Sequence, residues 1–123
     1  MTREQRYKAI FTSAYGYMTD APGNKPDNDD ELSREIFKAC KADKQEMFFG
    51  MEPDIPRIKK IFKVCYELLD KYKNGVPQTA WEKHEIYYYW KGKLEETDML
   101  GVRMFTACVV ELGRQYNSEY TGK

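Results

Sequence analysis

The sequence has few of the residues that most often carry catalytic or metal chemistry. Among its 123 residues it contains one histidine, His84, and three cysteines, Cys40, Cys65 and Cys108. No two cysteines form the close pair that is typical of a zinc site. Each cysteine stands in an apolar helical pattern, so we expect all three to be small, reduced core residues. The sequence therefore predicts no metal and no cofactor.

Known catalytic motifs are absent as well. The sequence contains neither of the glycine-rich patterns GxxxxGK[ST] and GxGxxG, and Tyr88 stands where an HExxH motif beginning at His84 needs its second histidine. A histidine without a positioned nucleophile or acid–base partner is not a catalytic site. We interpret His84 as a partly exposed helix residue. We name no catalytic residue and predict that the protein is not an enzyme.

The chain also lacks an excess of charge of either sign. Its 20 lysines and arginines balance 20 aspartates and glutamates, which gives a net charge of zero. A general electrostatic attraction to nucleic acid or to an anionic membrane is therefore excluded, and such binding would need a local patch.

Long apolar runs are missing too. No stretch approaches the roughly 20 apolar residues of a membrane span. The N-terminal residues have no apolar segment of the kind found in signal peptides. We expect a cytoplasmic protein that does not associate with membranes.

Apolar residues recur instead at helical spacing along most of the chain, and no alternating pattern indicates a strand. Start signals include capping boxes at Thr2–Gln5 and Thr79–Glu82, and Asp54 beside a proline. The expected helices cover residues 2–18, 30–44, 54–73, 80–95 and 99–116. In the last of these, the expected buried line consists of Val102, Phe105, Val109, Leu112 and Tyr116, with Met104 and Cys108 widening it. The sequence predicts one all-α domain over 1–123, a compact bundle of four to five mostly antiparallel helices.

The segments outside these helices are polar. Residues 20–30 contain prolines, glycine and several carboxylates, which predicts an exposed acidic loop. Its length is close to that of a calcium-binding loop, but Pro22 and Lys25 occupy the positions that require an oxygen ligand and a glycine. We interpret it as a solvated connector. The tail at 117–123 is expected to be frayed.

Aromatic residues are abundant, with ten tyrosines, six phenylalanines and two tryptophans. Five consecutive residues, 86–90, read Ile-Tyr-Tyr-Tyr-Trp and would surround a helix completely. A helix with one buried stripe cannot hide all five, so either this helix is packed on several sides or part of it awaits a partner. For the second interpretation, the expected partner-binding residues are Tyr87, Tyr88, Tyr89, Trp90, Phe48 and Phe49.

Two functional hypotheses remain. The first is a non-enzymatic protein-binding module, an adaptor or inhibitor-type accessory protein of the kind that phages and mobile elements carry. It would dock on a protein partner, or on a second copy of itself, through the aromatic helical surface. The alternative is a nucleic-acid-binding protein that uses the basic start of the third helix, Arg57, Lys59, Lys60 and Lys63.

Overall fold

The computed structural model of the chain describes residues 1–46 and 52–121, the last of these by its backbone alone, and these ranges contain helices but no strand. The helices are α1 (Arg3–Met18), α2 (Glu31–Glu46), α3 (Ile55–Lys71), α4 (Gln78–Glu82), α5 (Glu85–Lys91) and α6 (Met99–Thr121). The predicted compact all-α fold is confirmed. Within the described residues, no helix combines the length and the apolar character needed to cross a membrane.

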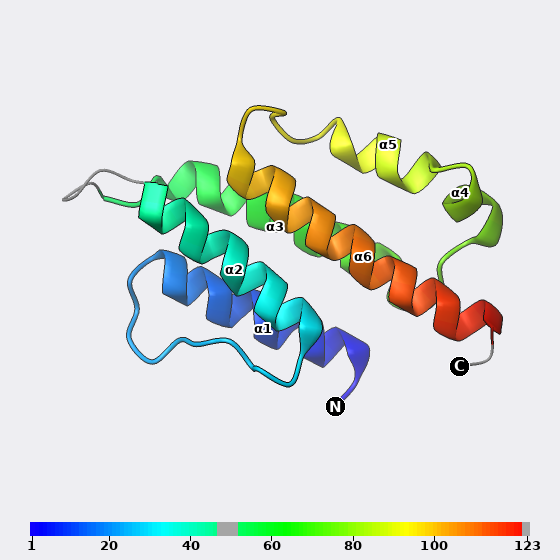
Figure 1. Cartoon of the computed structure of the whole chain (residues 1–123), viewed down its shortest axis with the longest axis horizontal. Coiled ribbons are helices and arrows are strands. Elements are labelled where there is room, and N and C mark those ends of the chain that lie inside the picture. The colour runs from blue at the N-terminus through cyan, green and yellow to red at the C-terminus, as the bar shows by residue number, and fades with distance from the viewer. Residues whose placement is uncertain (47–51, 122–123) are drawn as a thin grey trace.

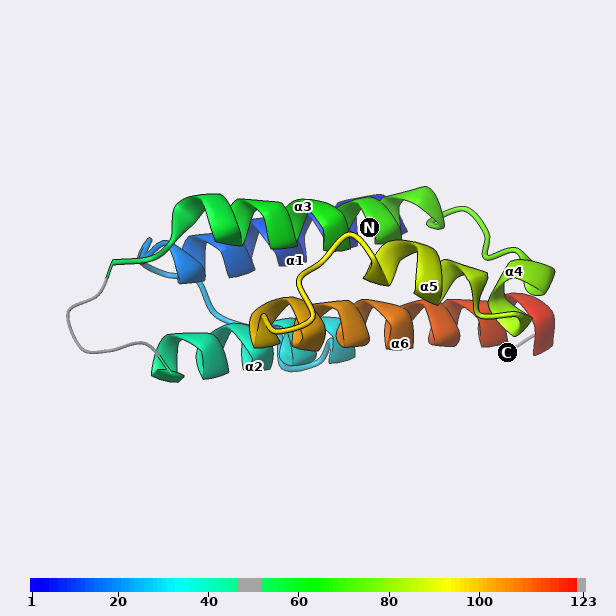
Figure 2. The ribbon, with the colours of Figure 1, turned by 90° about the horizontal axis from the view of Figure 1, so that it is seen from above.

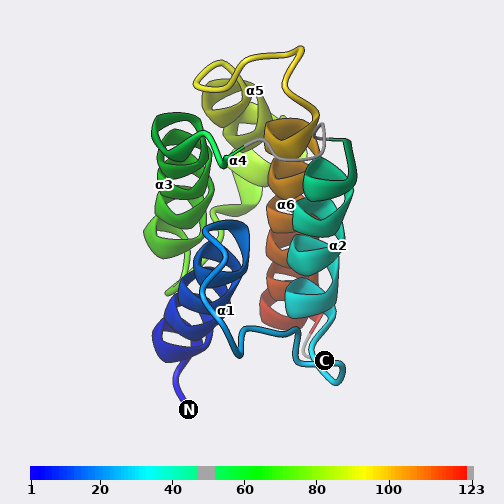
Figure 3. The same cartoon turned by 90° about the vertical axis from the view of Figure 1, so that its left-hand side faces the viewer.

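The four long helices form a bundle in which α1, α2, α6 and α3 follow one another around a shared core (Figures 1 and 3). Helices α1 and α2 point one way, and α3 and α6 point the other way (Figure 1). Each long helix thus has one parallel and one antiparallel neighbour. The parallel α1–α2 pair is possible because the loop between them, residues 19–30, runs back along the bundle before α2 begins (Figure 1).

The helix starts follow local sequence signals. Thr2 and Gln5 form the predicted capping box at the start of α1. Asp30 accepts a hydrogen bond from the backbone N–H of Ser33 at 3.1 Å and so caps α2. Asp54 caps α3 in the same way. These aspartates satisfy backbone donors that would otherwise have no partner within their helices.

The helix predicted at 80–95 is broken in two. His84 adopts a left-handed backbone conformation, with φ of 59°, between α4 and α5. The capping box predicted at Thr79–Glu82 is not formed, because α4 begins earlier, at Gln78, and Thr79 lies inside it. The break lets α4 and α5 follow different directions, and α5 lies along the bundle beside α6 (Figure 2).

Helix α6 is longer than predicted and buries a different line of residues. It continues to Thr121, so the tail that was expected to be frayed is helical as far as that residue. Glu119 accepts a hydrogen bond from the Val76 N–H at 2.9 Å, and the Tyr120 hydroxyl donates to the Val76 carbonyl at 2.9 Å. These contacts hold the last turns of α6 against the segment between α3 and α4.

The buried line of α6 consists of Leu100, Met104, Phe105, Ala107, Cys108, Glu111, Leu112 and Gln115. The sequence prediction placed Val102 and Val109 on that line, but Val102 is exposed and Val109 is only half-buried. Apolar residues occur on nearly every side of this helix, so periodicity alone did not distinguish the core side from the outer side.

Two helical glycines sit in contrasting surroundings. A Cβ on Gly16 would lie 2.4 Å from the side-chain nitrogen of Asn24, in the loop that follows α1. That nitrogen donates a hydrogen bond to the Ala21 carbonyl at 3.1 Å, which fixes its position. A Cβ on Gly101 would meet Ile61 at 3.7 Å, an ordinary van der Waals contact. A Cβ at Gly16 would therefore displace the Asn24 side chain, whereas a Cβ at Gly101 is not crowded.

We expect Gly16→Ala and Gly101→Ala to change stability in opposite directions. Gly16→Ala should lower the free energy of unfolding by about 1–2 kcal/mol, because the Asn24 side chain must shift and loses its hydrogen bond to the Ala21 carbonyl. Gly101→Ala should raise it by about 0.5 kcal/mol, because alanine favours the helix and fits the space. Urea denaturation of both variants measures the difference. Equal effects of the two substitutions would contradict this account of the loop.

Candidate functional site

Helix α5 carries the aromatic run and divides it between the core and the surface. Ile86 and Trp90 are buried, and Tyr87 is half-buried with its ring centroid 5.5 Å from that of Phe105 on α6. These residues anchor the helix. Trp90, named from the sequence as part of a docking surface, therefore belongs to the core, since it lies four residues after Ile86 and shares its side of the helix.

Tyr88 and Tyr89 face solvent. Their exposed fractions are 69% and 65%, far above those of the anchoring residues. The Lys93 ammonium lies 5.0 Å from the centre of the Tyr89 ring, a cation–π distance. Lys91 lies 5.3 Å from the Tyr87 ring. We define the α5 surface as Tyr88 and Tyr89 with Lys91 and Lys93 beside them. Phe48 and Phe49, the other predicted partner-binding residues, lie outside the described residues.

The basic start of α3 is divided in a different way. Arg57 donates hydrogen bonds to Asp98 at 2.6 Å and to Asp43 at 2.7 Å, and Asp43 is buried. These hydrogen bonds raise the pKa of Arg57 and lower that of Asp98. Arg57 is therefore engaged within the fold and is not free to contact a phosphate.

The other predicted nucleic-acid contacts are exposed lysines. Lys59, Lys60 and Lys63 all face solvent, and Lys63 lies 4.0 Å from Glu67 on the same helix. Without Arg57, these residues form a row on an amphipathic helix, and the structure provides no added feature in favour of nucleic acid.

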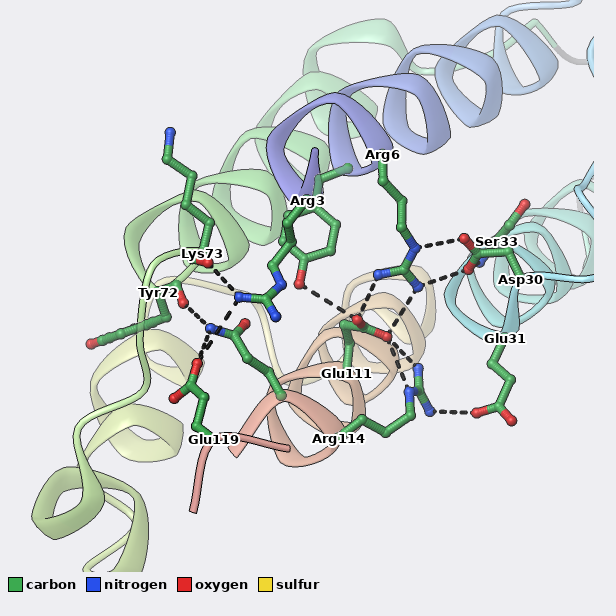
Figure 4. Close-up of polar contacts among 12 residues, drawn as sticks. Arg3, Arg6, Asp30, Glu31, Ser33, Tyr72, Lys73, Glu111, Arg114 and Glu119 are labelled. Atoms are coloured by element: carbon green, nitrogen blue, oxygen red, sulfur yellow. Dashed lines mark hydrogen bonds and ion pairs between the residues drawn. The ribbon is translucent and has the colours of Figure 1, made fainter. Parts of the chain in front are cut away.

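A second arginine is engaged at the opposite end of the bundle. Arg6 on α1 donates to Asp30 at 2.6 Å and to Glu111 at 2.7 Å (Figure 4). Glu111 also accepts from Arg114 at 2.7 Å, and Arg114 lies 3.0 Å from Glu31 (Figure 4). Each of these charged groups is paired across helices, so the cluster joins α1, α2 and α6 and has the character of a structural network.

The carboxylates of this network have altered acidity. Hydrogen bonding from Arg6 holds the pKa of Asp30 below its ordinary value. Burial by itself raises the pKa of Glu111, but hydrogen bonds from Arg6 and Arg114 outweigh it and lower the pKa. Both groups therefore stay ionised at neutral pH, which does not suit a general acid.

The three cysteines lie in the core, and the histidine lies at the surface. Cys40, Cys65 and Cys108 are all buried and free, as predicted. Burial raises the pKa of Cys40 to about 12, so its thiol stays protonated at neutral pH and is a poor nucleophile. His84 is exposed at the break between α4 and α5. Across residues 1–46 and 52–121, no three histidine, cysteine or acidic side chains are grouped as metal ligands would be.

A groove between α2 and α6 was not predicted. It encloses about 650 Å³, and its apolar lining includes Ala39, Ala42, Val102, Ala107 and Val110. Sequence reasoning missed it because Val102 was assigned to the core. The available signal was the spacing of Met99, Val102, Thr106 and Val110, which repeats every three or four residues and defines a second stripe on α6 beside the core stripe.

Acid should destabilise the protein through these paired carboxylates. Asp30, Asp98 and Glu111 have lowered pKa values in the folded chain, so their contribution is complete above the ordinary carboxylate pKa of about 4. As the pH falls below that value, protons bind preferentially to the unfolded chain, and stability should decrease. Urea denaturation at pH 7, 5 and 3 follows this loss.

A matched pair of variants tests the role of Glu111. Glu111→Gln should lower the free energy of unfolding by about 1–3 kcal/mol at pH 7, because Arg6 and Arg114 lose a charged acceptor. It should also make the stability less sensitive to acid. Glu67→Gln, at an exposed glutamate of α3, should change neither property. If the stability of Glu111→Gln changed with pH as that of the wild-type chain does, the role assigned to Glu111 in acid sensitivity would be wrong.

Comparisons with known proteins do not identify a family for this chain. No family model, no curated protein and no solved structure matches the chain.

Proposed function

We propose that the protein is a non-enzymatic protein-binding module that docks on a partner through the α5 surface. One observation carries this proposal: Tyr88 and Tyr89 are about two-thirds exposed on a helix that buried residues hold in place. Exposed large aromatic side chains on a fixed element are typical of contact sites. An adaptor or inhibitor-type accessory protein would use such a surface.

Tyrosine suits this role for physical reasons. Its ring contributes a large apolar area, and its hydroxyl forms hydrogen bonds at the edge of the contact. It loses little conformational freedom on binding because only two side-chain torsions are fixed. Tyrosine is accordingly enriched among the residues that dominate binding energy. With Ile86 and Trp90 buried, binding would not require α5 to be reorganised first.

The surroundings of the tyrosines favour a partner with some acidic character. Lys91 and Lys93 lie beside the aromatic rings. A partner carboxylate near these lysines would gain electrostatic attraction, which would fix orientation and speed association. The non-enzymatic part of the proposal is supported by the buried thiols, the isolated His84 and the mutually paired arginines and carboxylates described above.

The test compares affinity capture from the native cell with five baits: the wild-type chain, a double tyrosine variant, its two single variants and a lysine control. Tyr88→Ala/Tyr89→Ala should lose at least tenfold of the partner that the wild-type chain retains, and each single variant should lose part of it. Lys59→Ala/Lys60→Ala serves as the control, because these lysines are exposed on α3. Circular dichroism should give equal helicity for all baits.

Retention of the partner by the double tyrosine variant would refute the proposal. The proposal would also be refuted if the lysine variant lost a bound nucleic acid while the tyrosine variant captured protein as the wild-type chain does. That second result would restore the nucleic-acid alternative.

A further inference from the structure

The α2–α6 groove has the dimensions of a helix-binding site. Helices α2 and α6 lie side by side on the near side of the bundle in Figure 1. The lining runs from Glu31 to Ala42 on one helix and from Val102 to Arg114 on the other. At 1.5 Å per residue each wall is about 17 Å long, which corresponds to about three turns of an α-helix.

The composition of the groove favours an apolar helix face. Its small residues, Ala39, Ala42 and Ala107, leave space for the side chains of a third helix to enter between α2 and α6. Val102 and Val110 on one wall are 37% and 49% exposed. Unpartnered aliphatic side chains along a hollow of this length are the feature that an amphipathic helix covers when it binds in a groove.

The charges around the groove are unbalanced. Its lining contains the cations Arg34, Lys38, Arg103 and Arg114, against the carboxylates Glu31 and Glu35. Arg114 is paired with both Glu31 and Glu111, and Arg103 is paired with the exposed Glu46 at 3.1 Å. The lining charges outside these pairs are Arg34 and Lys38 against Glu35, an excess of one positive charge. Lys38 has no ion-pair partner among the described residues, and Lys41 extends the basic row by one turn on the exposed side of α2. An acidic occupant would neutralise this excess.

A second copy of the chain is a poor occupant. Its most apolar exposed stripe lies on α6, where Arg103 and Arg114 would approach the basic row of α2. The tyrosines of the α5 surface also lie beside lysines. A self-contact that places these cations opposite one another would bring like charges together, which opposes self-association.

We propose that the α2–α6 groove is a second docking site, and that it binds one α-helix of a partner protein, about three turns long, with an apolar face and acidic flanks. The apolar face would cover Val102, Thr106 and Val110. The acidic flanks would lie against Lys38 on one wall and against Arg103 on the other, where they would replace its exposed partner Glu46. The groove adjoins the α5 surface, because Val102 and Thr106 also line the hollow beside Lys91. Variants at Val110 and at the two tyrosines therefore test the two proposals separately.

The probe is a displayed library of 14-residue helical peptides with leucine fixed along one face and random residues at the flanking positions. Selection on the wild-type chain should enrich aspartate and glutamate at the flanks. Selection on Lys38→Glu/Arg103→Glu should enrich lysine and arginine instead, because these substitutions replace two positive charges of the groove with negative ones. The best wild-type binder, measured by fluorescence anisotropy, should bind Lys38→Glu at least tenfold more weakly.

Three further baits locate the site. Val110→Lys should abolish enrichment, because it places a charge on the apolar wall at an exposed position that the fold tolerates. Lys63→Glu changes an exposed residue of α3, which lies outside the groove. This variant and Tyr88→Ala/Tyr89→Ala should enrich the same acidic peptides as the wild-type chain. Thermal unfolding and circular dichroism confirm that each bait is folded.

The inference is overturned if no peptide is enriched, if the flanks show no preference for acidic residues, or if Lys38→Glu binds the selected peptide with unchanged affinity. Sedimentation velocity supplies a separate check. A dimer of the wild-type chain that Val110→Lys dissociates would assign the groove to a second copy and overturn the proposed occupant.

Discussion

Two arginines, each shared between carboxylates of two other helices, hold the ends of the bundle in register. Arg6 joins the start of α1 to Asp30 before α2 and to Glu111 on α6. Arg57 joins the start of α3 to Asp43 on α2 and to Asp98 before α6. A partly buried charge is tolerated only with close, well-oriented partners. Together these contacts restrict how far any long helix can slide past its neighbours.

The aspartates at these junctions have two roles. Asp30 caps α2 while it accepts from Arg6, and Asp98 accepts from the Leu100 N–H while it accepts from Arg57. Helix starts and helix packing are therefore set by the same side chains. With this frame fixed, α5 needs only a few buried residues to stay in place. Its tyrosines and the outer stripe of α6 remain uncovered, and these are the two surfaces to which we assign binding.

Local signals in the sequence predicted the local features well. Apolar spacing identified the long helices, and Thr2 and Asp54 marked two of their starts. The cysteines were placed correctly in the core. Features that depend on distant residues were not predictable in this way. Apolar spacing gives no signal for the left-handed conformation at His84, and the burial of Trp90 depends on the core that the other helices form. The groove could not be predicted because α6 is apolar on two sides. Only the helices packed against it determine which of these sides is buried.

Both arginine clusters draw a carboxylate from α6 or from the residue just before it. Asp98 completes the Arg57 cluster and Glu111 completes the Arg6 cluster. Helices α1, α2 and α3 leave the ribosome earlier. At that stage the chain contains both arginines but neither Asp98 nor Glu111. The nascent chain can form individual helices at that stage because their hydrogen bonds are local. Helix α1 packs on both α2 and α3, so part of the apolar surface can be buried at that stage. The sides of α2 and α3 that contact α6 stay exposed until α6 has emerged.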